Sequence, residues 1–252
     1  MMEIALIILF FILGLIFGSF FNVVGLRLPV NQPFTNDRSI CPACEHTLNW
    51  YELVPVLSHL LQLGKCRHCK ATISAVYPFG ELTTGLLFAL SYIITGLNLE
   101  LITALLLVSM LMIIFVSDIK YMLIPNKVLL FFLPFFVVMR FLQPLDQWWT
   151  SIAGALAGFG ITAIIIFASK GGMGAGDMKL FAILGFILGL EHILLVFFLS
   201  TILGAITGSL LLLLKLINRK QPIPFGPYIV IAAITTYFYG ESIINWYIKF
   251  YT

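Results

Sequence analysis

Long apolar runs separated by short polar stretches make up most of this sequence. A helix rises about 1.5 Å per residue, so roughly 20 apolar residues cross a hydrocarbon layer about 30 Å thick. Runs of that length predict membrane-spanning helices, with boundaries soft by a few residues. We predict eight of them, at about 4–25, 78–97, 99–117, 127–142, 150–169, 179–191, 193–215 and 227–246.

Local signals refine this pattern. The sixth run is short, which leaves open a tilted, broken or partly buried helix, and a tight turn around Asn98 separates the second run from the third. No basic leader precedes the first run and no small-residue cleavage site follows it, so we expect an uncleaved anchor. The small-residue patterns "GLIFG" (14–18) and "GALAG" (154–158) predict close helix packing.

Composition agrees with the apolar pattern. The chain has 252 residues, of which 61% are hydrophobic and 10% charged, against roughly 45–50% apolar residues in soluble domains. A soluble domain could not hide that much apolar surface from water. We therefore predict an all-α polytopic membrane protein, with membrane lipid as the solvent of most of the chain.

Charge distribution predicts the orientation, because cytoplasmic loops carry an excess of Lys and Arg. With an external N-terminus, 12 of the 14 basic residues fall on one side, and only Arg140 and Lys249 lie opposite. That side is then cytoplasmic. The topology explains the net charge of +3, so no nucleic-acid partner is needed. The twelve are Arg27, Arg38, Lys65, Arg67, Lys70, Lys120, Lys127, Lys170, Lys179, Lys215, Arg219 and Lys220.

All four cysteines lie in one long loop, as "CPAC" (41–44) and "CRHC" (66–69). Two such pairs can complete the tetrahedral thiolate shell that zinc prefers, although the gap between them is slightly longer than usual. Disulfides or a redox pair are the alternatives, and a reducing cytoplasmic loop disfavours them. We predict a closed, structural zinc site on Cys41, Cys44, Cys66 and Cys69, with His68 exposed. The predicted domains are a first helix (1–25), a zinc-binding cytoplasmic loop domain (26–77) and a helical membrane domain (78–252).

Two acidic residues end apolar runs at one predicted depth: Asp118 in "VSDIKYMLIPN" and Asp177 in "GGMGAGDMKLF". Ionisable residues at membrane depth indicate function by default. Two carboxyl groups that meet do not both ionise readily, so a pair supplies one acid and one base to activate a water. That is the requirement for peptide hydrolysis without a covalent intermediate.

The glycines before Asp177 carry a second prediction. We expect them to unwind the backbone just before this aspartate, so that a substrate peptide can approach closely. Lys120 and Lys179 are interpreted as anchors at the membrane surface. The glycines concerned are Gly171, Gly172, Gly174 and Gly176.

A structural alternative stays open for the aspartates. Asp118 could cap a helix start and Asp177 could initiate the sixth span. Glu81, in "YPFGELTTGLLF", is a third carboxylate at the same level, either a polar helix-end residue or a participant.

Several of these stretches resemble the type IV prepilin peptidases, polytopic membrane aspartic proteases of bacteria. "GAGDMK" (174–179) is similar to the GxGDxK signature of that family, and "SDIKYMLIPN" (117–126) looks like its first-aspartate motif. "GSFFNVVGLRLP" (18–29), "YPFGELTTGLLF" (77–88), "PFGPYI" (224–229) and the two CxxC pairs resemble further family motifs. The resemblance covers about residues 14 to 230.

This resemblance implies a bifunctional enzyme. Such enzymes cut a short basic leader from type IV prepilins or pseudopilins on the cytoplasmic side, and then methylate the new N-terminus with S-adenosylmethionine. Asp118 and Asp177 would be the catalytic pair, and the four cysteines would bind zinc. The methyltransferase half rests on analogy, because no glycine-rich nucleotide motif of the soluble kind is present; Glu81 and the loop are candidates by location.

Other functions remain as alternatives: a peptidase without methyltransferase activity, a proton- or ion-coupled transporter, a scaffold whose zinc loop docks partners, or a presenilin-type intramembrane protease. The transporter predicts flux without peptide cleavage, and the scaffold predicts that Asp-to-Asn changes are tolerated. The zinc loop and the first-loop motifs disfavour the presenilin type.

Overall fold

The computed structural model describes residues 2–33, 39–41, 43–169, 172–218 and 223–251. Within these ranges the regular elements are helices, accompanied by two isolated β-bridges, so the all-α prediction is confirmed. Gly171 of the predicted glycine turn, and Arg38, Lys170, Arg219 and Lys220 of the predicted cytoplasmic set, lie outside the described residues. The helices are α1 (Met2–Arg27), η1 (Leu28–Val30), η2 (Trp50–Glu52), α2 (Leu57–Leu61), α3 (Val76–Thr95), α4 (Leu99–Tyr121), α5 (Asn126–Leu142), α6 (Trp149–Ala168), α7 (Ala175–Leu188), α8 (Leu190–Leu213) and α9 (Gly226–Tyr251).

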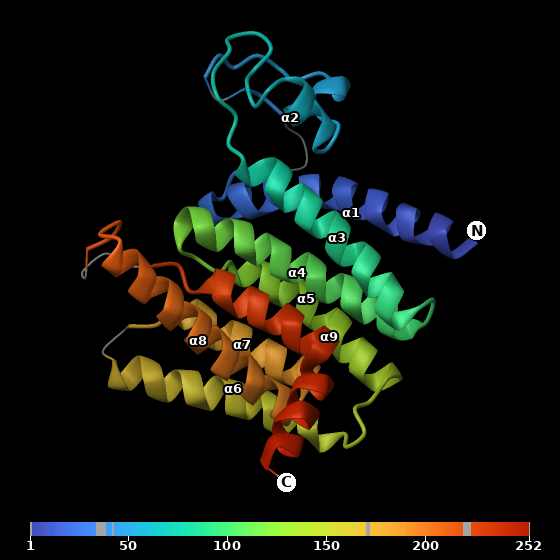
Figure 1. Ribbon diagram of the computed structural model, residues 1–252, viewed down its shortest axis with the longest axis vertical. Coiled ribbons are helices and arrows are strands. Elements are labelled where there is room, and N and C mark those ends of the chain that lie inside the picture. The colour runs from blue at the N-terminus through green and yellow to red at the C-terminus, as the bar shows by residue number, and fades with distance from the viewer. Residues whose placement is uncertain (1, 34–38, 42, 170–171, 219–222, 252) are drawn as a thin grey trace. The chain divides into compact units, whose positions relative to one another are not determined.

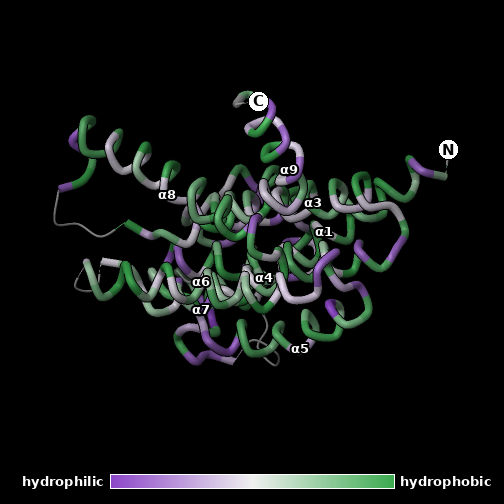
Figure 2. Tube along the Cα trace, turned by 90° about the horizontal axis from the view of Figure 1, so that it is seen from below, coloured by the Kyte–Doolittle hydropathy of each residue, from purple (hydrophilic) through white to green (hydrophobic). Residues whose placement is uncertain are grey.

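Each predicted apolar run falls on one of the long helices (Figure 1). Figure 2 shows hydrophobic residues along most of these helices and hydrophilic ones mainly in the segments between them. Four described segments are long and apolar enough to cross a membrane, so the chain is a multi-pass membrane protein. They are Met2–Val30, Leu99–Tyr121, Trp149–Ala168 and Leu190–Leu213; the count of eight spans stays a prediction.

The chain divides into two compact units, Met1–Val116 and Ser117–Thr252. In unit 1, α1 lies against α3 because glycines remove the side chains from the contact (Figure 1). A Cβ added at Gly14 would lie 2.7 Å from the Cα of Gly85, and one at Gly18 would lie 2.9 Å from the Cα of Glu81. The close packing predicted from "GLIFG" is therefore confirmed.

Unit 2 contains the end of α4 and the helices α5 to α9. Its closest helix contact joins α6 and α7, where Gly154 faces the carbonyl of Gly185 and Gly158 faces the carbonyl of Phe181. This confirms the packing predicted from "GALAG".

Two turns between helices depend on glycines with positive φ. Gly96 (φ 69°) ends α3, and Asn98 accepts the backbone N–H of Leu101, as expected for the tight turn predicted there. Gly189 (φ 84°) separates α7 from α8. The predicted boundary of the sixth run, at residue 191, was too late because the left-handed glycine ends the helix earlier.

Candidate functional site

The two cysteine pairs of unit 1 have the same backbone geometry. The N–H groups of Cys41 and Cys66 donate to the carbonyls of His46 and Ala71, at 3.0 and 2.8 Å. In each pair the residue after the second cysteine has a positive φ (Glu45, 56°; Lys70, 61°) and its N–H donates back to the carbonyl of the first cysteine. Each pair is thus a tight turn that points two sulfur atoms the same way.

These turns bring four thiols into one cluster. All four Sγ atoms lie within 4.8 Å of one another, and those of Cys41 and Cys69 are 3.8 Å apart. The four cysteines are free thiols, so the disulfide alternative is not the arrangement found. The cluster could hold a metal ion.

Electrostatics differ between the two cysteines of the first pair. Backbone N–H groups of Ala43 and Cys44 lower the pKa of the Cys41 thiol to about 7. The N–H of His46 acts to lower the pKa of Cys44, but burial and the neighbouring sulfur atoms together raise it to about 12. Of these two thiols, Cys41 is therefore the more easily ionised.

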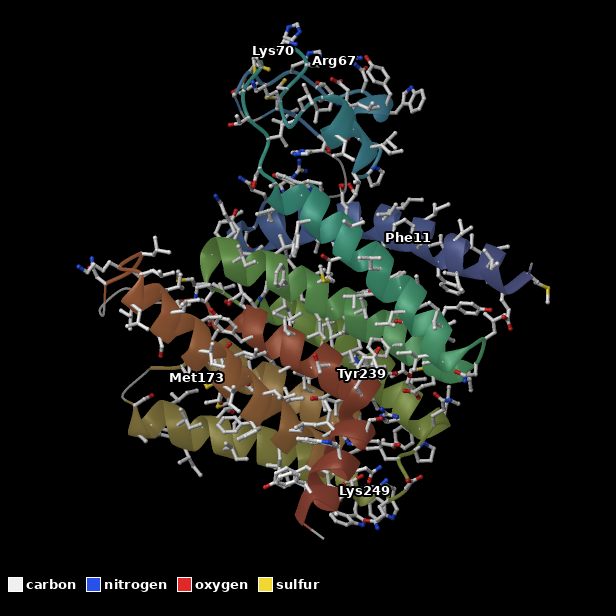
Figure 3. The ribbon with its side chains drawn as sticks, viewed as in Figure 1. Phe11, Arg67, Lys70, Met173, Tyr239 and Lys249 are labelled. Atoms are coloured by element: carbon white, nitrogen blue, oxygen red, sulfur yellow. The ribbon has the colours of Figure 1, made fainter. Side chains whose placement is uncertain are left out.

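Ring contacts surround the thiol cluster. His46 and His68 stack with their centroids 4.6 Å apart, and His68 is exposed, as predicted. The guanidinium of Arg67 lies 5.4 Å from the ring centroid of Tyr51; Figure 3 labels Arg67 and Lys70 in this loop. Among the described residues, the four cysteines are the one group of side chains placed to hold a metal ion.

Asp118 lies in the last turn of α4, which runs four residues beyond the predicted end of the third run. Its side chain is buried (5% exposed), and its Oδ2 accepts the backbone N–H of Gly226 at 2.8 Å. Gly226 is the first residue of α9, so this carboxylate caps a helix 108 residues away.

Asp177 lies in the first turn of α7 and is also buried (8% exposed). Its Oδ2 accepts the N–H of Gly174 at 3.0 Å. The prediction that Gly176 unwinds the backbone was wrong: this glycine is helical, and an added Cβ would lie 3.0 Å from the Cβ of Ile124. Gly172 and Gly174 do lie outside the helix.

Unit 2 brings the two aspartates into one neighbourhood. Their carboxylates are close enough to interact electrostatically. Lys179 donates to the side chain of Asn126 at 3.0 Å, which joins α7 to the start of α5. The capping contacts of the structural alternative are therefore present, beside the electrostatic interaction between the two acids.

Sequence reasoning missed the residues that hold the aspartates in place. Gly226 belongs to the "PFGPYI" stretch, which stood out only by resemblance, and its link to Asp118 is a tertiary contact without a local signal. Asn126 is the last residue of the first-aspartate motif. That position was the sequence signal that could have pointed to its contact with Lys179.

Glu81, the third predicted carboxylate, lies in unit 1 and is buried (8% exposed). Its Oε2 accepts the N–H of Val56 at 2.8 Å, and the Ser19 side chain also hydrogen-bonds to it. It joins the cysteine loop to α3 and α1.

The described residues thus define a multi-pass helical membrane protein with a four-thiol loop and a pair of buried, neighbouring aspartates. A model of the bacterial peptidase A24 N-terminal domain matches residues 12–95, and a model of the type IV leader peptidase family matches residues 105–209. This chain belongs to the type IV leader peptidase family, which confirms the resemblance seen in its motifs.

Individual relatives agree with this assignment. A Bacillus subtilis (strain 168) protein is 46% identical over 239 residues, covering 95% of this chain and 96% of the relative. Relatives from Aeromonas salmonicida (strain A449; 35% over 271 residues, 96% and 93% covered) and Stutzerimonas stutzeri (31% over 276 residues, 98% and 96% covered) are also similar. All three are named prepilin leader peptidase/N-methyltransferase. No solved structure matches the chain.

Proposed function

We propose that this protein is a membrane aspartic endopeptidase that removes the leader from type IV prepilins or pseudopilins and then methylates the new N-terminus. The observation that carries the proposal is the pair of buried, electrostatically interacting aspartates in unit 2. Family membership and the names of the relatives support the substrate class and the second activity.

The geometry of Asp118 and Asp177 suits water activation. In each residue Oδ2 accepts a backbone N–H, and the carboxyl group has a second oxygen with acceptor capacity of its own. One carboxylate takes a proton from water as the hydroxide adds to the scissile carbonyl, and the protonated partner stabilises the developing oxyanion. A proton then passes to the leaving amine, so that water is added across the peptide bond.

The substrate would reach this pair at the membrane surface. A prepilin presents a basic leader to the cytoplasm and an apolar helix to the lipid, so its cleavage site falls at the boundary. In the predicted topology the eight helices span the inner membrane, the N-terminus lies outside, and both aspartates and the cysteine loop face the cytoplasm.

The thiol cluster fits a zinc ion. A tetrahedron with Zn–S bonds of about 2.3 Å has sulfur atoms about 3.8 Å apart, and the Sγ atoms of Cys41 and Cys69 are separated by 3.8 Å. Four thiolates leave zinc no open position, so the ion would fix the shape of the loop without taking part in catalysis.

The methyl donor would be S-adenosylmethionine, which supplies a methyl group bonded to a positively charged sulfur. In unit 1 the carboxylate of Glu81 and the side-chain oxygen of Asn22 are buried hydrogen-bond acceptors, and no described residue donates to that oxygen of Asn22. Their chemistry fits a cation at this place, either the donor's sulfonium or the amine to be methylated.

The test is the identity of the products when a prepilin is co-expressed with the protein. Intact-mass and N-terminal analysis of the pilin should show loss of the leader and one added methyl group on the new N-terminus. A pilin of unchanged mass, together with proton or ion flux in vesicles containing the protein, would overturn the proposal in favour of a transporter. Cleavage without methylation would support the alternative of a peptidase that lacks methyltransferase activity.

A further inference from the structure

A polar cluster in unit 1 brings together groups from α1, α3 and the cysteine loop. Glu81 receives hydrogen bonds from the N–H of Val56 and from Ser19, and interacts electrostatically with His59. Asn22 lies one helical turn after Ser19 on α1, and its Oδ1 faces the residue before Glu81: a Cβ added at Gly80 would lie 2.5 Å from that oxygen. The carboxylate of Glu81 and the amide carbonyl of Asn22 are thus placed at neighbouring positions of the contact between α1 and α3.

Oδ1 of Asn22 is the atom of this cluster that points to a ligand. The side chain is 1% exposed, and Oδ1 is buried without a hydrogen-bond donor. Its orientation is fixed, because Nδ2 donates to the carbonyl of Tyr77 at 2.9 Å and a flipped amide would set two oxygens against each other. Buried oxygens of this kind are nearly always paired in native proteins.

The backbone at Val56, which is bonded to Glu81, gives a second sign. This β-branched residue has φ 61° and ψ −50°, a conformation that such residues rarely adopt. Its N–H is held by Glu81. Strained backbone persists where surrounding contacts enforce it, and it gathers at functional sites.

We propose that Glu81 and Asn22 bind a primary ammonium group, namely the N-terminus that leader removal creates on the pilin. An ammonium has three N–H donors and a positive charge, which matches one carboxylate and one unpaired carbonyl. This inference rests on the proposed function and assigns the amine-binding part of its methylation step.

Glu81 would also prepare the amine for reaction. An ammonium has no lone pair, so it must lose a proton before its nitrogen can form a bond to a methyl carbon. The sulfonium donor would supply that methyl group, its S–CH3 bond breaking to leave a neutral thioether. The Glu81 carboxylate, hydrogen-bonded to that ammonium, takes the proton, and the Asn22 carbonyl keeps hold of a remaining N–H.

The experiment measures the binding of synthetic apolar peptides that lack a leader, using full-length protein in lipid nanodiscs. One peptide has a free N-terminus and the other is N-acetylated, which removes the charge and two donors. The wild-type protein should bind the free amine roughly tenfold or more tightly. Glu81→Gln, which keeps the acceptor for Val56, should bind both peptides equally.

Two further variants complete the test. Asn22→Leu should reduce the preference, and Ser91→Ala, a matched change on α3 whose hydroxyl bonds only within the helix, should keep it. An unchanged preference in Glu81→Gln would overturn the proposal. The proposal would also be overturned if Glu81→Gln lost S-adenosylmethionine binding but kept the preference for the free amine. Glu81 would then bind the sulfonium of the methyl donor and not the amine.

Failure of the proposed function is seen separately, as the absence of prepilin cleavage by the wild-type protein. The peptide measurement does not depend on it, because the peptides carry no leader.

Discussion

The cysteine loop of unit 1 (residues 39–75) and the aspartate region of unit 2 (residues 117–126, 172–179 and 223–229) hold their chemical groups in different ways. In the described part of the cysteine loop the helices are the short η2 and α2, and its two turns direct four thiols at one centre. The aspartate region uses helix ends, where backbone N–H groups hold the two carboxylates.

This difference separates two sources of order. A loop with so little regular structure would gain its shape from an ion bound by its four thiolates. Helices in contact at glycines gain theirs from backbone packing. The cysteine loop should therefore respond to metal removal, and the aspartate region should respond to glycine-to-alanine substitutions at its helix contacts.

The largest expected effect is on the metal of the cysteine loop. Cys66→Ser should abolish stoichiometric zinc, because three thiolates no longer close the tetrahedral shell, and should make residues 39–75 sensitive to protease. Metal analysis of the purified protein and limited proteolysis measure this. The control is His68→Ala, an exposed neighbour outside the thiol cluster, which should keep its zinc; full zinc in Cys66→Ser would contradict the assignment.

The next effect is on helix packing in unit 2. Gly185→Ala would place its Cβ 2.8 Å from the backbone nitrogen of Ala155, with closer contacts to Gly154, and should destabilise the protein by roughly 1–3 kcal/mol. Thermal unfolding in detergent measures it. Gly160→Ala is the matched control on α6, where an added Cβ meets no described atom within 4 Å; equal melting temperatures for the two variants would show that glycine packing does not hold this region.

A smaller change, in the rate of leader cleavage, is expected from displacing the carboxylate of Asp118. A Cβ at Gly226 would lie 2.6 Å from Oδ2 of Asp118, so Gly226→Ala should displace that carboxylate. We expect kcat for leader cleavage to fall by roughly 10- to 100-fold with little change in KM. Gly208→Ala, whose Cβ would make only an ordinary contact at 3.6 Å with Ile223, should behave as wild type, and an unaffected kcat in Gly226→Ala would argue against the role of this contact.

The smallest effect is on backbone conformation in the cysteine loop. Lys70 has φ 61°, and a left-handed conformation costs a residue with a Cβ roughly 1–2 kcal/mol. Lys70→Gly should therefore stabilise the zinc-bound loop by about 1 kcal/mol, seen as slower release of zinc to a chelator. Lys65→Gly, in a β-bridge with Thr72, should have the opposite effect and release zinc faster. Faster zinc release from Lys70→Gly would contradict the backbone strain assigned to Lys70.

Much of this arrangement could be predicted from the sequence, because the signals were local. The apolar runs predicted the helices, the paired glycines predicted close helix packing without naming the partner, and the CxxC spacing predicted the thiol cluster. The motifs around Asp118 and Asp177 predicted the family, which the comparisons confirm.

The remainder depended on tertiary contacts. The glycines before Asp177 suggested an unwound backbone, yet Gly176 is helical. Its lack of a side chain instead lets α7 approach Ile124. The bond from Gly226 to Asp118 joins residues 108 positions apart. The unpaired oxygen of Asn22 became visible only once its surroundings were known.

The most direct test of the account is the rate of leader cleavage by purified Asp118→Asn and Asp177→Asn, compared with Asp146→Asn, an exposed aspartate of the same unit. Each amide keeps an acceptor for the backbone N–H but cannot exchange a proton with water. We predict that both variants lose cleavage by roughly 10²–10⁴-fold while Asp146→Asn keeps the wild-type rate. A wild-type rate in either Asp118→Asn or Asp177→Asn, with the protein correctly inserted, would contradict the aspartate pair.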